Sequence, residues 1–207
     1  GQAIVREARQ NPDIVAITAA MKDGTGLAPF AEEFPDRFVD AGIAEEHAVG
    51  MAAGLAAGGK KPVVAIYSTF LQRAIDQMTI NCALPGLDVV FAIDRAGIVG
   101  EDGPTHQPIE HLAALRATPD TLVFRPADTK ETAACYIAAL RHGLPAVMAL
   151  TRQNLPQYAE TSRDVERGAY ILRDTANGLP DVILMASGSE VQCIMEAADA
   201  LEKEDIS

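Results

Sequence analysis

The stretch "KPVVAIYSTFLQRAIDQMTINCALPGLDVVFAID", from Lys61 to Asp94, contains two apolar runs separated by a longer segment with a helical pattern. The runs at 61–67 and 87–94 are apolar almost throughout, which is typical of strands covered on both faces. Residues 69–83 between them have the length of a helix. A strand, a helix and a second strand in this order predict two parallel strands joined by a right-handed crossover.

The same alternation continues on both sides of this unit. Further strands are expected at 13–18, 37–42, 121–128, 146–151 and 181–187. Further helices are expected at 2–10, 45–58, 108–116, 129–142 and 189–203. Regular alternation of strands and helices predicts an α/β fold with an open, mostly parallel sheet and helices on both faces.

A polar stretch at 154–167, "NLPQYAETSRDVER", interrupts this alternation. We therefore expect one domain over 1–153, a linker over 154–178 and a single strand–helix unit over 179–207. One such unit cannot bury both of its faces. It either joins the main sheet or begins a domain that is not fully present.

The charge and cysteine content of the chain limit which partners it can bind and indicate its cellular compartment. Seventeen basic and 29 acidic side chains among 207 residues give a formal net charge of −12, which argues against nucleic-acid and anionic-membrane partners. The cysteines Cys82, Cys135 and Cys193 are far apart and odd in number, so they predict neither a disulfide framework nor a zinc site. No apolar run has membrane-spanning length and no signal peptide is recognisable. We expect a reducing, cytoplasmic location.

Three arginines follow predicted strands of this acidic chain: Arg95, Arg125 and Arg152. Ligands of open parallel sheets bind outside the carboxyl ends of the strands, and arginine forks suit phosphate and carboxylate groups. This placement predicts a small anionic substrate. The alternative is that some of the arginines are structural and pair with one of three aspartates, Asp94, Asp102 and Asp128.

The loop "DRAGIVGEDGPTHQP", at 94–108, is the most unusual segment of the chain. Its glycines allow the backbone to approach a ligand closely, and polar loops on a rigid sheet are where function concentrates. A lone histidine is more often a structural residue. His106 lies in this glycine-rich loop four residues after Asp102, which favours a functional role.

The segment "GIAEEHAVGMAAG", at 42–54, places Glu45, Glu46 and His47 at the start of a predicted helix. Its pattern is not HExxH, which excludes a zinc-protease helix, and we expect no metal site. Consecutive helix residues point about 100° apart, so the two carboxylates cannot face the same pocket. The simplest role for both is to stabilise the helix N-terminus, by about 0.3–1 kcal/mol each.

Four segments in this order resemble the pyrimidine-binding module of the transketolase family, which uses thiamine diphosphate: "DAGIAEEHAVGMAAGLA", "YSTFLQRAIDQ", "DRAGIVGEDGPTHQP" and "LTRQN". Up to about Gly100 the chain is similar to 1-deoxy-D-xylulose-5-phosphate synthase, and from Glu101 onwards to transketolase. Both enzymes transfer a two-carbon unit. Transketolase takes it from a ketose phosphate, whereas the synthase takes it from pyruvate. The final "ILMASGSEV" resembles the start of the family's C-terminal domain, here cut short.

The resemblance implies which residues contact the cofactor. Glu45 is implied as the catalytic acid that donates a proton to the aminopyrimidine ring, and Phe70 as the residue that stacks on that ring. Tyr67 and Arg73 are implied to lie near the cofactor and substrate. Glu46 is then expected to serve the helix dipole or a salt bridge.

The resemblance also implies the substrate contacts. Asp102 and His106 are implied to contact hydroxyl groups of the donor sugar, with His106 assisting proton transfer. Arg95 and Arg152 are implied to bind phosphate. Transketolases have a phosphate-binding histidine where this chain has Asp94. This difference strengthens the case for Arg95 as a phosphate-binding residue.

The family's diphosphate-binding module carries a Gly-Asp-Gly motif that this sequence does not contain. We therefore expect Mg²⁺ and the cofactor diphosphate to be bound only through a partner module, in a homodimer or with a separate subunit. The substrate loop and "TRQN" predict transketolase-type ketol transfer between phosphorylated sugars. The alternatives are 1-deoxy-D-xylulose-5-phosphate synthase activity, from pyruvate and glyceraldehyde 3-phosphate, and a non-catalytic subunit of such an enzyme.

Overall fold

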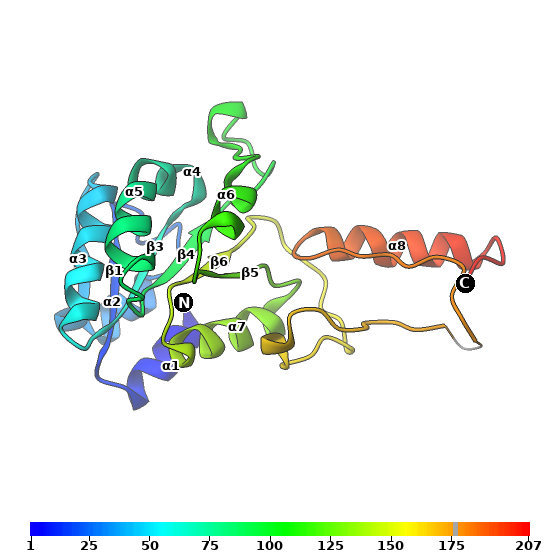
Figure 1. The fold of residues 1–207 in the computed structure, drawn as a ribbon, viewed down its shortest axis with the longest axis horizontal. Coiled ribbons are helices and arrows are strands. Elements are labelled where there is room, and N and C mark those ends of the chain that lie inside the picture. The colour runs from blue at the N-terminus through cyan, green and yellow to red at the C-terminus, as the bar shows by residue number, and fades with distance from the viewer. Residues whose placement is uncertain (176–177) are drawn as a thin grey trace.

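The structure is a computed structural model that describes residues 1–175 and 178–207. Its centre is an open sheet of six parallel strands in the order β2-β1-β3-β4-β6-β5 (Figure 1). The strands are β1 (Ile14–Thr18), β2 (Phe38–Asp40), β3 (Lys61–Tyr67), β4 (Val90–Asp94), β5 (Leu122–Phe124) and β6 (Ala146–Ala149). The predicted fold class is confirmed.

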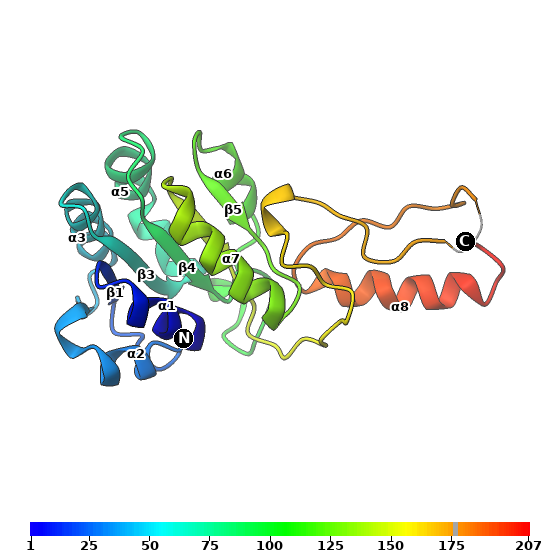
Figure 2. The same ribbon diagram turned by 90° about the horizontal axis from the view of Figure 1, so that it is seen from below.

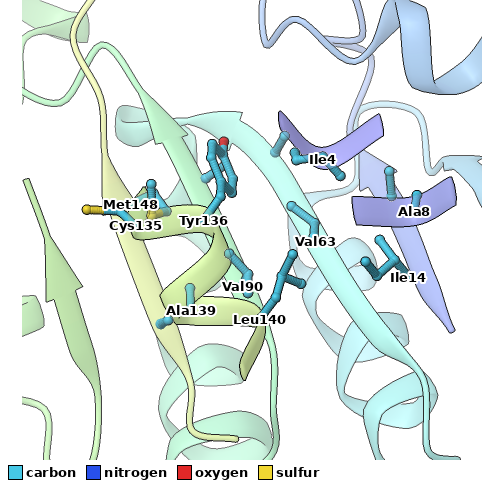
Figure 3. Close-up of a cluster of buried hydrophobic side chains, with 14 of the residues drawn as sticks. Ile4, Ala8, Ile14, Val63, Val90, Cys135, Tyr136, Ala139, Leu140 and Met148 are labelled. Atoms are coloured by element: carbon cyan, nitrogen blue, oxygen red, sulfur yellow. The ribbon is translucent and has the colours of Figure 1, made fainter. Parts of the chain in front are cut away.

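Helices cover both faces of the sheet, as Figure 2 shows. One face carries α1 (Gln2–Gln10), α2 (Ala28–Glu33) and α7 (Thr129–His142). Figure 3 shows side chains of α1 and α7, among them Ile4 and Leu140, packed over Val63 and Val90 of the sheet. This buried apolar layer holds the strand ends in fixed positions, because its removal from water is the main favourable term in folding.

The other face carries α3 (Glu45–Ala57), the segment 68–83 and α6 (His111–Ala117). The buried side of α3 consists of small residues, Ala48, Val49, Ala52 and Ala53. Because these side chains are short, the helix backbone lies close to the sheet, and the first turn of α3 is brought near the carboxyl ends of the strands.

The single helix expected at 69–83 is divided in the structure. It consists of α4 (Ser68–Leu71), a 3₁₀ turn η2 (Gln72–Ala74), α5 (Ile75–Gln77) and a π-helical turn η3 (Met78–Ala83). In the π turn, the Leu84 N–H donates to the Thr79 carbonyl five residues earlier, at 2.9 Å. The Thr79 hydroxyl donates back to the Ile75 carbonyl at 2.9 Å, a local bond that competes with regular helix geometry.

The prediction of a strand at 181–187 is wrong. A strand needs a neighbouring strand to pair its backbone groups, and the described part of the chain offers none there. Val182, Ile183 and Met185 of this apolar run are exposed. The run leads into α8 (Glu190–Glu202), which extends away from the sheet in both ribbon views (Figures 1 and 2).

The expected linker, 154–178, has little regular structure where it is described. Its described residues form one short 3₁₀ helix, η5 (Val165–Arg167), and residues 176–177 lie outside the described part. The Lys130 ammonium on α7 donates to three backbone carbonyls of this segment, those of Tyr158, Ala159 and Thr161. The segment is therefore fastened to the domain. The division into domains stays a prediction.

The described helices include none that is both long enough and apolar enough to cross a membrane.

Candidate active site

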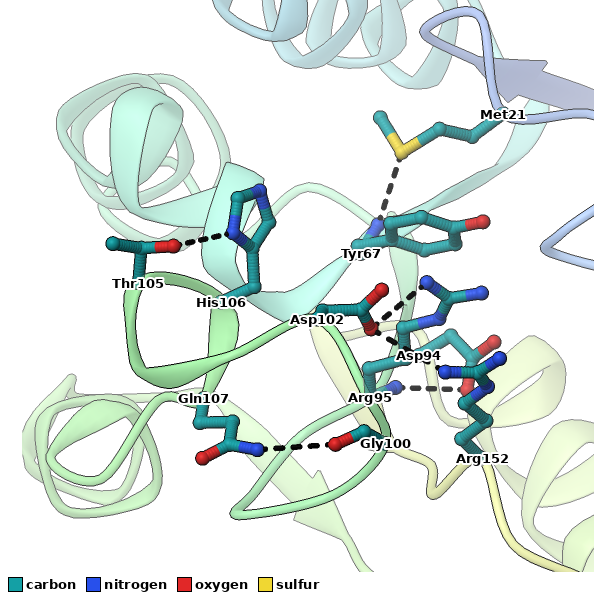
Figure 4. A network of polar contacts seen from close by, with 10 residues as sticks. All are labelled: Met21, Tyr67, Asp94, Arg95, Gly100, Asp102, Thr105, His106, Gln107 and Arg152. Atoms are coloured by element: carbon teal, nitrogen blue, oxygen red, sulfur yellow. Dashed lines mark hydrogen bonds and ion pairs between the residues drawn. The ribbon is translucent and has the colours of Figure 1, made fainter.

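The candidate site lies at the carboxyl ends of three neighbouring strands. Tyr67 ends β3 and is directly opposite Asp94, which ends β4. Arg95 follows β4, and Arg152 follows β6 by three residues. The loop from 95 to 108 folds back over these ends, so that Asp102 and His106 join them (Figure 4).

Three rings and one guanidinium are in contact at this edge. The Tyr67 and Phe70 rings are stacked with centroids 6.1 Å apart, and the Phe70 and His106 rings are nearly perpendicular with centroids 5.6 Å apart. The Arg95 guanidinium carbon lies 4.0 Å from the centre of the Tyr67 ring, a cation–π contact. The structure thus gathers four of the predicted site residues into one continuous surface.

Two arginines share one carboxylate. The Oδ2 atom of Asp102 lies 3.1 Å from Nη1 of Arg95 and 3.7 Å from Nη1 of Arg152 (Figure 4). The Asp94 carboxylate instead accepts the backbone N–H of Arg95 at 2.8 Å. Burial raises the pKa of Asp94, although the two arginines act in the opposite direction. The Nε atom of Arg95 is buried without a hydrogen-bond partner among the described residues.

The two glutamates at the start of α3 have different environments. Glu45 is 2% exposed, whereas Glu46 and His47 are exposed. The Oε2 atom of Glu45 is 3.6 Å from Nη1 of Arg73, which lies on the same segment as Phe70. No hydrogen bond reaches this buried oxygen within the described chain. A buried polar atom without a partner costs free energy, so its presence needs a functional explanation.

Arg125 is not part of this cluster. Its guanidinium donates to the backbone carbonyl of Ser187 at 2.7 Å and forms an ion pair with Glu190 of α8. Arg125 therefore links the end of β5 to the C-terminal segment. Arg125 therefore has a structural role, as the alternative interpretation of the sequence allowed, but its partner is Glu190 and not one of the three aspartates named there.

A cavity of about 430 Å³ opens beside the cluster. It is lined by the loop after β1, by the ends of β4 and β6, and by the start of α7. Hydroxyl, amide and carboxylate groups line it, from residues that include Thr25, Asp94, Asp128, Thr151 and Asn154. Its lining, as described, has no lysine or arginine, so the cations Arg73, Arg95 and Arg152 lie outside the cavity lining.

Sequence reasoning missed several residues that hold the site in place. The Tyr67 backbone N–H donates to the sulfur of Met21 at 3.4 Å. The Tyr67 hydroxyl lies against Gly24, where an added Cβ would be 1.9 Å from the phenol oxygen. The glycine at position 24 was the feature of the sequence that could have indicated this close contact. The hydrogen bond between Ser68 and His111 had no signal, because its partners are 43 residues apart.

The described residues contain no group of three or more His, Cys, Asp or Glu side chains placed to hold a metal ion.

A parallel α/β domain of this class binds ligands outside the carboxyl ends of its strands, where the aromatic ring stack and the buried acid Glu45 lie. Residues 1–157 match the family model described as transketolase, pyrimidine binding domain, and 168–207 match a transketolase-like C-terminal domain. The chain belongs to the transketolase family through its pyrimidine-binding domain. The predicted membership is confirmed, and the family's cofactor is thiamine diphosphate, as expected.

Curated relatives to which this chain is similar are named 1-deoxy-D-xylulose-5-phosphate synthase. That of Anaeromyxobacter dehalogenans is 45% identical over 207 residues, covering 100% of this chain and 32% of the relative. That of Syntrophus aciditrophicus is 56% identical over 152 residues, covering 73% of this chain and 23% of the relative. The chain spans about a third or less of the length of these relatives.

Similar solved structures are described as transketolases. A split-gene transketolase, described as an inactive β4 tetramer, has a TM-score of 0.87 and 34% identity, covering 100% of this chain and 66% of that one. The transketolase from Leishmania mexicana has a TM-score of 0.86 and 32% identity, covering 93% of this chain and 30% of that one. The mixed resemblance to synthase and transketolase is therefore confirmed.

Proposed function

We propose that this chain forms the pyrimidine side of the cofactor site in an enzyme that makes 1-deoxy-D-xylulose 5-phosphate from pyruvate and glyceraldehyde 3-phosphate. Identities of 43–56% with relatives named for that reaction support it, against 30–34% for the transketolase structures. The comparisons thus favour the synthase reaction over the transketolase reaction that the substrate loop predicts.

The buried, unpartnered Oε2 atom of Glu45 is the observation that carries the proposal. A carboxyl group in this position fits the ring nitrogen of an aminopyrimidine, which would supply the missing hydrogen-bond partner. The stacked rings of Tyr67 and Phe70 offer the flat apolar surface that such a ring needs. The residues present therefore fit the pyrimidine end of thiamine diphosphate.

Each residue near this end has a defined part in the proposal. When bound, thiamine diphosphate supplies a carbon nucleophile that breaks and forms carbon–carbon bonds beside a carbonyl group. Glu45 would share a proton between Oε2 and the pyrimidine nitrogen, while Phe70 would orient the ring by stacking. Arg73, which is more than half exposed, keeps the Glu45 carboxyl group in place from the solvent side.

On the substrate side, Arg95 and Arg152 bind the phosphate or carboxylate of the substrate. The Asp102 carboxylate holds both guanidinium groups and also accepts substrate hydroxyls. The Nδ1 atom of His106 contacts the Thr105 hydroxyl at 2.8 Å, so we assign proton transfer to Nε2.

The proposed enzyme needs a diphosphate-binding module, which binds the diphosphate and Mg²⁺. That module comes from a second copy of a longer chain or from a separate subunit. A similar structure described as a split-gene transketolase and an inactive β4 tetramer supports this arrangement. We expect the 207-residue chain to have no activity until a diphosphate module is added.

The test combines the chain with a diphosphate module from one of the named synthases. Pyruvate with glyceraldehyde 3-phosphate should then be converted, whereas xylulose 5-phosphate with ribose 5-phosphate should not. Glu45→Gln should abolish turnover, and the exposed neighbour, Glu46→Gln, is the matched control and should lose little. Equal loss in both variants would contradict the role of Glu45.

Transketolase-type transfer is the second candidate. It is favoured by the segment from Glu101 onwards and by the transketolase structures that the fold matches. Turnover of xylulose 5-phosphate with ribose 5-phosphate, and not of pyruvate, would establish it. A complemented chain that binds no thiamine diphosphate would instead support a non-catalytic subunit.

A further inference from the structure

A buried hydrogen bond lies behind the aromatic surface. The Ser68 hydroxyl, at 0% exposure, is 3.0 Å from the Nδ1 atom of His111, which begins α6 and is also buried. Ser68 is the first residue of α4, next to Tyr67 and two positions before Phe70. In such surroundings a broken hydrogen bond would leave two buried polar groups without partners, which makes the pair costly to separate.

Three consecutive residues of α4 contact the segment that carries His106. Ser68 bonds His111, the Thr69 hydroxyl donates to the Thr105 carbonyl at 3.4 Å, and the Phe70 ring meets the His106 ring. Of the three contacts, the bond to His111 is the one that is fully buried. The turn bearing Phe70 and the loop bearing His106 are thus joined at their base by this bond.

The group beside Nε2, the other ring nitrogen of His111, bears on which partner donates this hydrogen bond. The Nε2 atom of His111 lies 3.7 Å from a carboxylate oxygen of Glu110, which favours the proton on Nε2. With the proton on Nε2, Nδ1 accepts and the Ser68 hydroxyl donates. Burial lowers the pKa of His111, so the ring is neutral at neutral pH.

We propose that His111 is a positioning residue that acts through Ser68, holding Phe70 and His106 in the relative placement that the cofactor ring and the substrate require. The proposal rests on the proposed function for its effect on the cofactor. Its structural part, the link between Phe70 and His106, concerns this chain alone.

Two histidine variants separate hydrogen bonding from packing. His111→Asn keeps a polar atom near the position of Nδ1, and His111→Gln moves it towards the position of Nε2. Ser68→Ala removes the other partner with a minimal change of volume. Nuclear Overhauser contacts between the Phe70 and His106 rings should persist in His111→Asn and disappear in His111→Gln and Ser68→Ala.

The complemented enzyme gives the second measurement, the dissociation constant of thiamine diphosphate by calorimetry. We expect it to rise about tenfold in Ser68→Ala and in His111→Gln, the fold-change that corresponds to one lost hydrogen bond. The double variant should be no worse than either single one, because both remove the same bond.

The outcomes are distinguishable. Unchanged ring contacts in Ser68→Ala, or equal damage in His111→Asn and His111→Gln, would overturn the positioning role. Absence of cofactor binding by the unsubstituted complemented chain would overturn the proposed function, while the ring contacts would still decide the structural link. Additive losses in the double variant would show separate structural roles for the two residues and would also overturn the proposal.

Discussion

Replacing Glu45 by methionine should make the protein more stable. Most core substitutions destabilise, so the expected sign is unusual. Glu45 is 2% exposed and its Oε2 atom has no hydrogen-bond partner within the described chain. Methionine has a similar length and helix propensity but no charge to desolvate. A residue kept for its chemistry at a cost in stability is expected to behave in this way.

The magnitude follows from three contributions. Relief of a buried, unsatisfied polar atom is worth about 1–3 kcal/mol. The lost pairing with Arg73 subtracts no more than about 1 kcal/mol, because that arginine is 54% exposed and solvent screens the pair. The lost charge in the first turn of α3 subtracts about 0.3–1 kcal/mol. The net expectation for Glu45→Met is an increase of about 1 kcal/mol in the free energy of unfolding.

Urea unfolding followed by far-ultraviolet circular dichroism measures this change, because the chain contains no tryptophan for fluorescence. An increase of about 1 kcal/mol should raise the melting temperature by about 2–4 °C. Glu46→Met, on the exposed side of the same turn, should stay within about 0.5 kcal/mol of the parent. A loss of stability in Glu45→Met would mean that the carboxylate is a structural group, and the functional explanation would fail.

Three further predictions concern the surroundings of the site. Gly24→Ala should displace the Tyr67 ring, since the new Cβ would lie 1.9 Å from the phenol oxygen, and ring-current shifts in the nuclear magnetic resonance spectrum should report it; an unmoved ring would contradict the close approach. Tyr170→Phe should cost about 1–2 kcal/mol in urea unfolding, because it removes the donor to the Glu131 carboxylate, and faster proteolysis after residue 153 should accompany it. Through His111, stability should fall as the pH drops below 6.5, because burial lowers the folded-state pKa and the unfolded chain binds the proton more readily. Urea titrations at about pH 5 and pH 8 should show a smaller difference for His111→Asn than for the parent, and an equal difference would contradict this assignment.

The central strands were predictable because burial on both faces demands apolar runs. β1, β3, β4 and β6 lie within or at the predicted positions for this reason. The apolar run at 181–187 has the same composition but no neighbour to pair with, and local composition cannot report a missing neighbour. The π-helical turn at Met78–Ala83 accompanies a hydrogen bond from one threonine hydroxyl, that of Thr79, to a backbone carbonyl. The spacing of apolar residues carries no information about such a bond.

Some features of the candidate site could likewise be predicted from the sequence, and others could not. Helix geometry alone predicted that Glu45 and Glu46 face different environments, since successive side chains diverge. The partners of the arginines could not be predicted, because Arg95, Arg125 and Arg152 all follow strands and differ only in what the tertiary fold brings to them. Two of them meet Asp102, and the third meets the C-terminal segment.

The shared carboxylate also bears on how a strongly acidic chain would present the proposed anion site. Arg95 and Arg152 carry two positive charges, and both lie near a single oxygen of Asp102, so this carboxylate balances one of the two charges. Burial raises the pKa of Asp94, the second carboxyl group at this edge, while the hydrogen bond from the Arg95 N–H and the charges of Arg95 and Arg152 lower it. The Asp102 carboxylate holds both guanidinium forks in place before substrate binds, which lowers the entropy lost on binding. In the proposed function, the attraction of an anionic substrate to a chain with a formal net charge of −12 would therefore be local, supplied by two arginines held at the ends of two neighbouring strands.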